Sequence, residues 1–206
     1  MLPFFPEIFD EFLSPDFLKE VRQKFHYDEA QALEFQEVAE KMLPRMREEA
    51  FWERRVSPGE NKHRGRTDGV VCEHVVMSLG NGVDRLQESY NEREMLSQSY
   101  MLEVLAGEVL LRGYAAYNRY VKNNTDWHVA AYHFPGSEED FPLEMLPEML
   151  KELTPAVTCN SAFCMRPQKS VAFVAELTKD DNVLCRGICA GCSNTDCSNR
   201  MVEIIG

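Results

Sequence analysis

The sequence lacks the long hydrophobic runs of membrane proteins. No stretch approaches the roughly 20 consecutive apolar residues that a membrane-spanning helix needs. The opening residues, MLPFFPEIFDEFL, carry prolines and acids where a signal peptide would have a basic region and then an apolar one. We therefore expect no membrane partner and a cytoplasmic location.

Positive charge is also scarce. The 206 residues include 22 Lys and Arg against 34 Asp and Glu, which gives a formal net charge of -12. The phosphate backbone of a nucleic acid would repel such a chain at long range, so the sequence argues against a nucleic-acid partner. The short basic segment 54–68 is the exception, and its Pro and Gly residues predict an exposed loop. This loop is either a solvated surface or a face that docks an acidic partner.

The common catalytic fingerprints are missing as well. The sequence contains no GxSxG, P-loop, dinucleotide-binding glycine motif or HExxH, so it does not predict a standard hydrolase, NTPase or dehydrogenase. His74, His128 and His133 fall on expected strands. A histidine in such a place is a hydrogen-bonded structural residue more often than a ligand or a base.

Hydrophobic spacing predicts helices mixed with strands. Spacings of three and four indicate two or three helices over residues 9–53, interrupted at Ser14-Pro15, and one long helix from about Glu92 to Val121. A short helix is expected at 143–153, and strands are expected at 69–80, 127–134, 157–165 and 171–177. Because helices and strands do not alternate strictly, the pattern favours an α+β fold with a mostly antiparallel, twisted sheet and packed helices.

Three regions follow from this organisation. Residues 1–67 form a helical N-terminal region with the basic loop, residues 68–178 form an α+β core, and residues 179–206 form a Cys-rich tail. A chain of this length can bury a core without disulfides or metals. A metal in the tail would therefore need an explanation in function or in local order.

The tail holds four of the seven cysteines, namely Cys185, Cys189, Cys192 and Cys197. In a reducing compartment, such a cluster indicates metal or redox chemistry more than disulfides. Neighbouring Gly, Ser and Asn residues let the backbone turn so that the thiolates can converge. Four thiolates suit an iron–sulfur cluster and Zn²⁺ alike. The irregular spacing and the lack of a nearby His favour the iron–sulfur cluster, with a structural zinc site as the alternative.

Two further segments are candidates for binding a ligand. A Pro-Gly turn follows the strand expected at 127–134, and it exposes backbone groups that can bind a small molecule, with a run of acids after it. The alternative is a plain surface turn. Arg166 lies in a basic break between two expected strands, where it either anchors a carboxylate or phosphate or is an exposed hairpin charge.

Taken in order, these segments resemble the activation (reactivation) domain of cobalamin-dependent methionine synthase, and more closely its short stand-alone relatives in anaerobic bacteria. The similarity runs from about Cys72 to Arg200. It covers, in this order, CEHVVMSLGNGVDRL, AGEVLLRGYAAYN, FPGSEEDFPLEML, LTPAVTCNSAFCMRPQKSVAFV and CAGCSNTDCSNR. The order of the blocks is more specific than any single block.

The resemblance implies a C-shaped α+β unit that binds S-adenosylmethionine and docks over a corrinoid domain. In that family, one-electron reduction of inactive Co(II) and methyl transfer from S-adenosylmethionine restore methylcobalamin. The implied partner is a corrinoid protein or a cobalamin-dependent methyltransferase that carries the cobalamin. The Cys-rich tail is similar to that of the short relatives, where a redox centre would make sense as the electron donor.

The family's ligand loop, R-x-x-x-G-Y, falls here on Tyr132, Pro135, Gly136 and Ser137. Tyr132 stands where the family has Arg, and Ser137 where it has Tyr. Loss of a charge-assisted contact with a carboxylate lowers affinity by about ten- to a hundredfold, so we expect S-adenosylmethionine to bind weakly or not at all. Either Arg166, on the adjacent expected strand, replaces the lost cation, or the protein has abandoned the ligand.

These features together predict an accessory protein for reductive reactivation of, or docking to, a corrinoid-dependent methyltransferase. The alternative is a non-catalytic binding module with a structural zinc site at its C-terminus.

Overall fold

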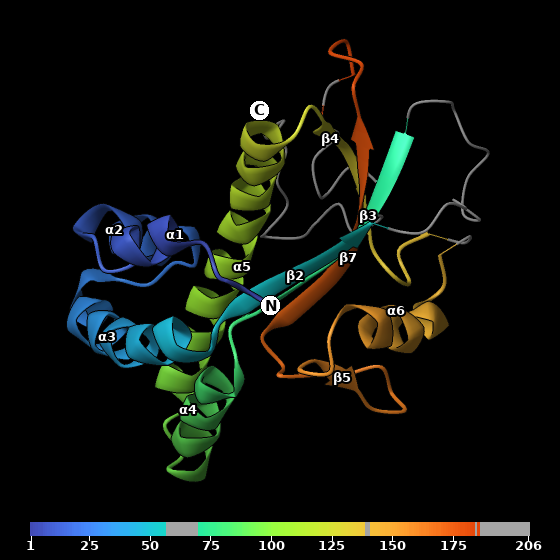
Figure 1. Ribbon diagram of the computed structural model, residues 1–206. Coiled ribbons are helices and arrows are strands. Elements are labelled where there is room, and N and C mark those ends of the chain that lie inside the picture. Colours follow the sequence, from blue (N-terminus) through green and yellow to red (C-terminus); the bar gives the residue numbers. More distant parts are fainter. Residues whose placement is uncertain (57–69, 139–140, 184, 186–206) are drawn as a thin grey trace. The chain divides into compact units, whose positions relative to one another are not determined.

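The computed structural model describes residues 1–56, 70–138, 141–183 and 185 (Figure 1). It is an α+β structure with a five-stranded antiparallel sheet of order β1-β2-β3-β7-β4, which confirms the predicted fold class at that level. No helix in these ranges has the length and apolar character to cross a membrane.

The α-helices are α1 (Pro6–Glu11), α2 (Pro15–Lys24), α3 (Ala32–Glu49), α4 (Asn81–Glu92), α5 (Leu96–Asn124) and α6 (Leu146–Leu153). Single 3₁₀ turns, η1 (Glu29–Gln31) and η2 (Leu143–Met145), precede α3 and α6. The strands of the large sheet are β1 (Leu2–Pro3), β2 (Phe51–Val56), β3 (Val70–Ser78), β4 (His128–His133) and β7 (Ser170–Thr178). A separate two-stranded sheet joins β5 (Thr158–Cys159) and β6 (Met165–Arg166).

The chain forms two compact units, and neither is one continuous stretch. The first unit contains residues 1–52, 77–114 and 165–171. The second contains residues 53–76, 115–164 and 172 onward. The strands β2, β3 and β7 and the helix α5 each begin in one unit and continue into the other.

Helix α2 of the first unit begins where the sequence predicts an interruption. The Ser14 hydroxyl accepts a hydrogen bond from the Phe17 N–H at 3.2 Å, and Pro15 occupies the first helical position. The helices α1 to α5 bury a core in this unit that is built mainly from aromatic side chains, Leu and Met. Its largest fully buried members are Phe4, Phe12, Phe35, Met42, Met46, Met77, Leu79, Met101, Leu102 and Leu105.

Helix α4 is an element that the sequence did not predict. It follows β3 through Gly80, whose φ of +83° is favourable only for glycine, and a Cβ there would overlap Glu49. The Glu49 carboxylate accepts the Gly82 N–H at 2.8 Å and also binds Arg85, so the end of α3 caps the start of α4. The predicted long helix therefore starts at Leu96 rather than at Glu92.

The second unit is organised by the antiparallel pairing of β4 with β7, in which Tyr132 lies opposite Ala175 and His133 opposite Val174.

Two sequence predictions that concern strands were wrong. The end of the predicted N-terminal helices and the start of the basic loop form the strand β2 instead. The single strand predicted at 157–165 is replaced by β5 and β6, because the Asn160 side chain accepts the N–H groups of Ala162 and Cys164 at 2.9 and 3.0 Å and turns the chain.

Candidate functional site

The turn after β4 is fixed by its own hydrogen bonds. The Gly136 N–H donates to the Phe141 carbonyl at 2.7 Å, and the Ser137 hydroxyl and N–H donate to the Phe134 carbonyl at 2.7 and 3.0 Å. Gly136 has a φ of +85°, which is favourable for glycine. Gly136 and Ser137 are exposed, so the predicted ligand turn lies on the surface of the second unit.

Tyr132 does not face the solvent beside this turn. Its side chain is 6% exposed and meets the Phe173 ring edge-on, with 5.4 Å between ring centroids. Phe173 also contacts the rings of Tyr117 and Phe134, at 5.6 and 6.1 Å. Tyr132, the residue expected at the ligand-binding Arg position of the resembled family, is therefore part of the aromatic core of this unit.

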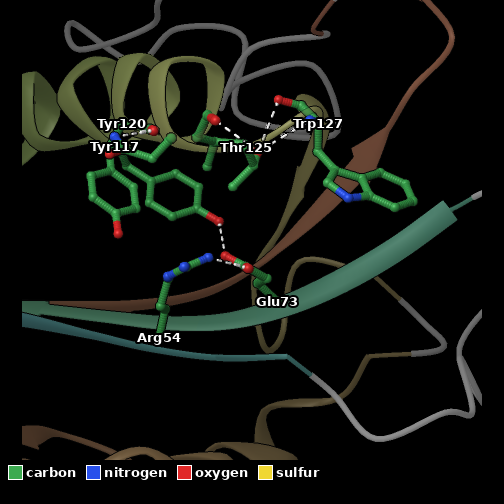
Figure 2. Close-up of polar contacts among 8 residues, drawn as sticks. Arg54, Glu73, Tyr117, Tyr120, Thr125 and Trp127 are labelled. Carbon is green, nitrogen blue, oxygen red and sulfur yellow. Dashed lines mark hydrogen bonds and ion pairs between the residues drawn. The ribbon is translucent and has the colours of Figure 1, made fainter.

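A buried polar cluster includes Tyr117, one of these aromatic residues (Figure 2). The Glu73 side chain on β3 is 4% exposed, and its two carboxylate oxygens are held by different elements. The Tyr117 hydroxyl of α5 donates to Oε2 at 2.8 Å, and Arg54 of β2 donates to Oε1 at 2.5 Å. The Arg54 guanidinium also lies over the Tyr120 ring, 5.3 Å from its centroid.

Burial and the Glu73 carboxylate shape the ionisation of this cluster. Desolvation first, and then the Glu73 charge and its hydrogen bond, raise the pKa of the Tyr117 hydroxyl far above its usual range. Tyr117 therefore remains a neutral hydrogen-bond donor.

The sequence analysis predicted that Arg54 belongs to an exposed basic loop. The structure corrects this, because Arg54 lies on β2 and is committed to Glu73.

His133 forms a second polar cluster, on the opposite face of β4 from Tyr132. Its Nδ1 lies 2.7 Å from Glu138 Oε1, and its Nε2 lies 3.3 Å from Glu176 Oε2. Glu176 is two residues beyond Val174, the β7 residue opposite His133, so a diagonal cross-strand contact is expected. The two carboxylates lie at opposite nitrogens of one ring and do not converge on a common point.

The predicted ligand-binding residues are divided between the two units. Arg166 belongs to the first unit, its side chain is 60% exposed, and its Nη1 lies 3.8 Å from Glu88 Oε1 of α4. Tyr132, Pro135, Gly136 and Ser137 all belong to the second unit.

Of the four cysteines of the predicted metal site, the structure describes only Cys185. Cys185 is buried, whereas Cys189, Cys192 and Cys197 lie outside the described residues. Within the described ranges, no group of three or more His, Cys, Asp or Glu side chains could hold a metal ion. A metal centre on the four clustered cysteines stays a prediction.

The second unit thus offers a surface turn that is closed by its own hydrogen bonds, a buried polar cluster around Glu73 and a partly exposed polar cluster around His133. Such a turn can bind a small polar molecule or a protein surface through backbone groups. Tyr132, however, supplies no positive charge that could pair with a ligand carboxylate. The turn could be predicted from the sequence, but the Arg54–Glu73–Tyr117 cluster could not, because Arg54 and Tyr117 are 19 and 44 residues away from Glu73 along the chain.

No protein-family model matches this sequence, and no curated protein matches it.

Proposed function

We propose that this chain is a cytoplasmic accessory protein that docks against a corrinoid-dependent methyltransferase and supports its reductive reactivation. The observation that carries the proposal is the ordered similarity of five segments to the activation domain of cobalamin-dependent methionine synthase. The α+β architecture is compatible with that similarity. The segment FPGSEEDFPLEML also begins with a surface turn and leads into α6, as a ligand loop and its supporting helix would.

We assign the role of electron carrier to the terminal cysteines. An iron–sulfur cluster on Cys185, Cys189, Cys192 and Cys197 would supply single electrons at a low potential. S-adenosylmethionine is the proposed methyl donor. Its affinity is expected to be low, because Tyr132 is buried against Phe173 and cannot pair with a carboxylate.

The first test is metal analysis of protein purified without oxygen. Wild-type protein should be brown and contain iron and sulfide, and Cys192→Ser should lower the metal content per chain sharply. Cys72→Ser is the matched control and should leave the metal content unchanged, since Cys72 lies on β3, far from the tail in sequence. Equal loss in both variants, or no metal in the wild type, would contradict the assignment.

The second test is the reaction itself. Protein reduced with dithionite and freed of excess reductant should convert a Co(II) corrinoid protein to its methylated form when S-adenosylmethionine is present. The cobalt absorption spectrum reports the conversion, and omission of S-adenosylmethionine is the control. Spectra that stay at Co(II) with several corrinoid partners would overturn the proposal.

The second candidate function is a binding module with a structural zinc site. The closed hydrogen bonding of the turn and the buried Tyr132 favour this candidate, since both suit a rigid docking surface. Calorimetry with S-adenosylmethionine separates the two. Weak binding that Arg166→Ala abolishes and Arg85→Ala preserves would favour the first function. No binding together with a colourless, zinc-loaded protein would favour the second.

A further inference from the structure

The His133 side chain contacts both the residue that ends the candidate turn and a strand of the sheet. Its ring lies between the Glu138 carboxylate, which follows the turn, and the Glu176 carboxylate on β7. All three side chains are shielded from solvent, with exposed fractions of 13% for His133, 17% for Glu138 and 28% for Glu176. The contacts join residues that are 5 and 43 positions apart, so they fasten a local turn to a distant strand.

The chemistry of these partners fixes the proton count. An ionised carboxylate only accepts hydrogen bonds, and a neutral imidazole carries one N–H donor and one lone pair. A neutral His133 could satisfy one carboxylate, but its lone pair would face the other and be repelled. Both contacts are attractive when His133 carries a proton on each nitrogen and donates from both.

We infer that His133 in its doubly protonated form is the positioning residue that holds the turn of residues 134–138 against β7. Its ring contacts the Glu138 carboxylate from the turn and the Glu176 carboxylate from β7. The inference rests on the proposed function only where it concerns which partner protein the turn binds. The fastening of the turn does not depend on a corrinoid partner.

The direction of the pH dependence follows from this arrangement. Both contacts need an N–H donor from His133, so the bridge is lost when His133 gives up one of its two ring protons as the pH rises. The turn should loosen in the same pH range, while the rest of the unit keeps its order.

Nuclear magnetic resonance of the full-length protein tests this directly. The imidazole nitrogens of His133 should titrate together with the hydrogen-exchange protection factor of the Gly136 amide, which donates within the turn. We expect that protection factor to fall by roughly three- to tenfold on deprotonation. A His133 ring that is neutral at pH 6, or a Gly136 protection factor that is unchanged by its titration, would overturn the inference.

Variants separate positioning from general stability. Glu138→Gln and Glu176→Gln should each shift the His133 titration to lower pH and lower the protection of Gly136, without changing unfolding by urea more than slightly. His128→Gln is the matched control on the same strand, because the His128 ring contacts the Val183 carbonyl and His128 is five residues before His133. A change in His128→Gln equal to that in Glu138→Gln would also overturn the inference.

The outcome is independent of the corrinoid assay. A failed cobalt conversion with an intact His133 profile would reject the proposed function alone. A normal conversion with a flat profile would reject the positioning role alone.

Discussion

At the scale of single residues, Glu73 is a buried polar side chain of the second unit that is held from two sides. It is almost fully buried, and Arg54 and Tyr117 each satisfy one of its oxygens. A buried carboxylate that loses one donor keeps its desolvation cost without compensation. The three side chains therefore act as one group.

Replacement of Tyr117 by Phe should destabilise the protein by about 1–3 kcal/mol, because Glu73 Oε2 loses its donor in a buried site. Urea unfolding measures the change. Tyr100→Phe is the control on the same helix, since the Tyr100 side chain is 58% exposed, and its effect should stay within about 0.5 kcal/mol. Equal effects in the two variants would show that the hydrogen bond to Glu73 contributes little.

Tyr27 allows a prediction at alkaline pH. Burial, with the nearby Tyr100 and Glu34, raises the pKa of Tyr27 from 10.0 to about 12. The folded state thus keeps a proton that the unfolded chain releases, so the unfolding free energy should decline as the pH rises between these two values.

Tyr27→Phe should remove part of that decline. It should change stability little at neutral pH, because the Tyr27 hydroxyl has no hydrogen-bond partner among the described residues. Urea unfolding at a series of pH values measures both effects. A wild-type decline that persists unchanged in Tyr27→Phe would assign it to other tyrosines.

The residues that the sequence could predict are those with local partners. Ser14 and Pro15 predict the start of α2, because Ser14 caps the helix through Phe17, only three residues later. The Pro-Gly turn is likewise recognisable from adjacent residues. Glu73 gives no such sign, because its partners come from β2 and α5 and become neighbours only after folding.

At the scale of elements, the same contrast between local and distant partners explains why α3 could be predicted and α4 could not. Helix α3 has a long apolar repeat and was predicted, whereas α4 has only a few apolar positions and no side-chain cap of its own. Its first turn depends on Glu49, which is 33 residues earlier. Strand β2 was missed for a similar reason, since it lies between β1 and β3 in the sheet and its own sequence alternates only weakly.

Two glycines of α5 give a matched test of packing. A Cβ at Gly113 would lie 2.9 Å from Met77 Sδ and 3.3 Å from Phe4 Cζ, whereas a Cβ at Gly107 would meet nothing within 4 Å. Gly113→Ala should cost about 1–2 kcal/mol, because overpacking outweighs the gain in helix propensity. Gly107→Ala should instead stabilise the protein by about 0.5–1 kcal/mol. Thermal and urea unfolding of both variants check this, and a stabilising Gly113→Ala would show that Met77 moves aside freely.

At the scale of the whole molecule, the excess of acids dominates the electrostatics. The formal net charge is -12, so like charges repel one another across the folded surface. Raising the salt concentration from about 10 to about 150 mM should screen this repulsion and raise the melting temperature by about 2–4 °C. A melting temperature that falls with salt would mean that ion pairs such as Lys24–Glu108 outweigh the repulsion.

The interleaved composition of the two units has a consequence for protein synthesis. The ribosome makes residues 1–52 before residues 165–171, yet both stretches belong to the first unit. The helices of residues 1–52 therefore emerge before their unit can be completed, and the unit closes only after residues 165–171 have been made. Contacts between such distant stretches also slow folding. The nascent chain is thus expected to need protection by chaperones until residues 165–171 have emerged.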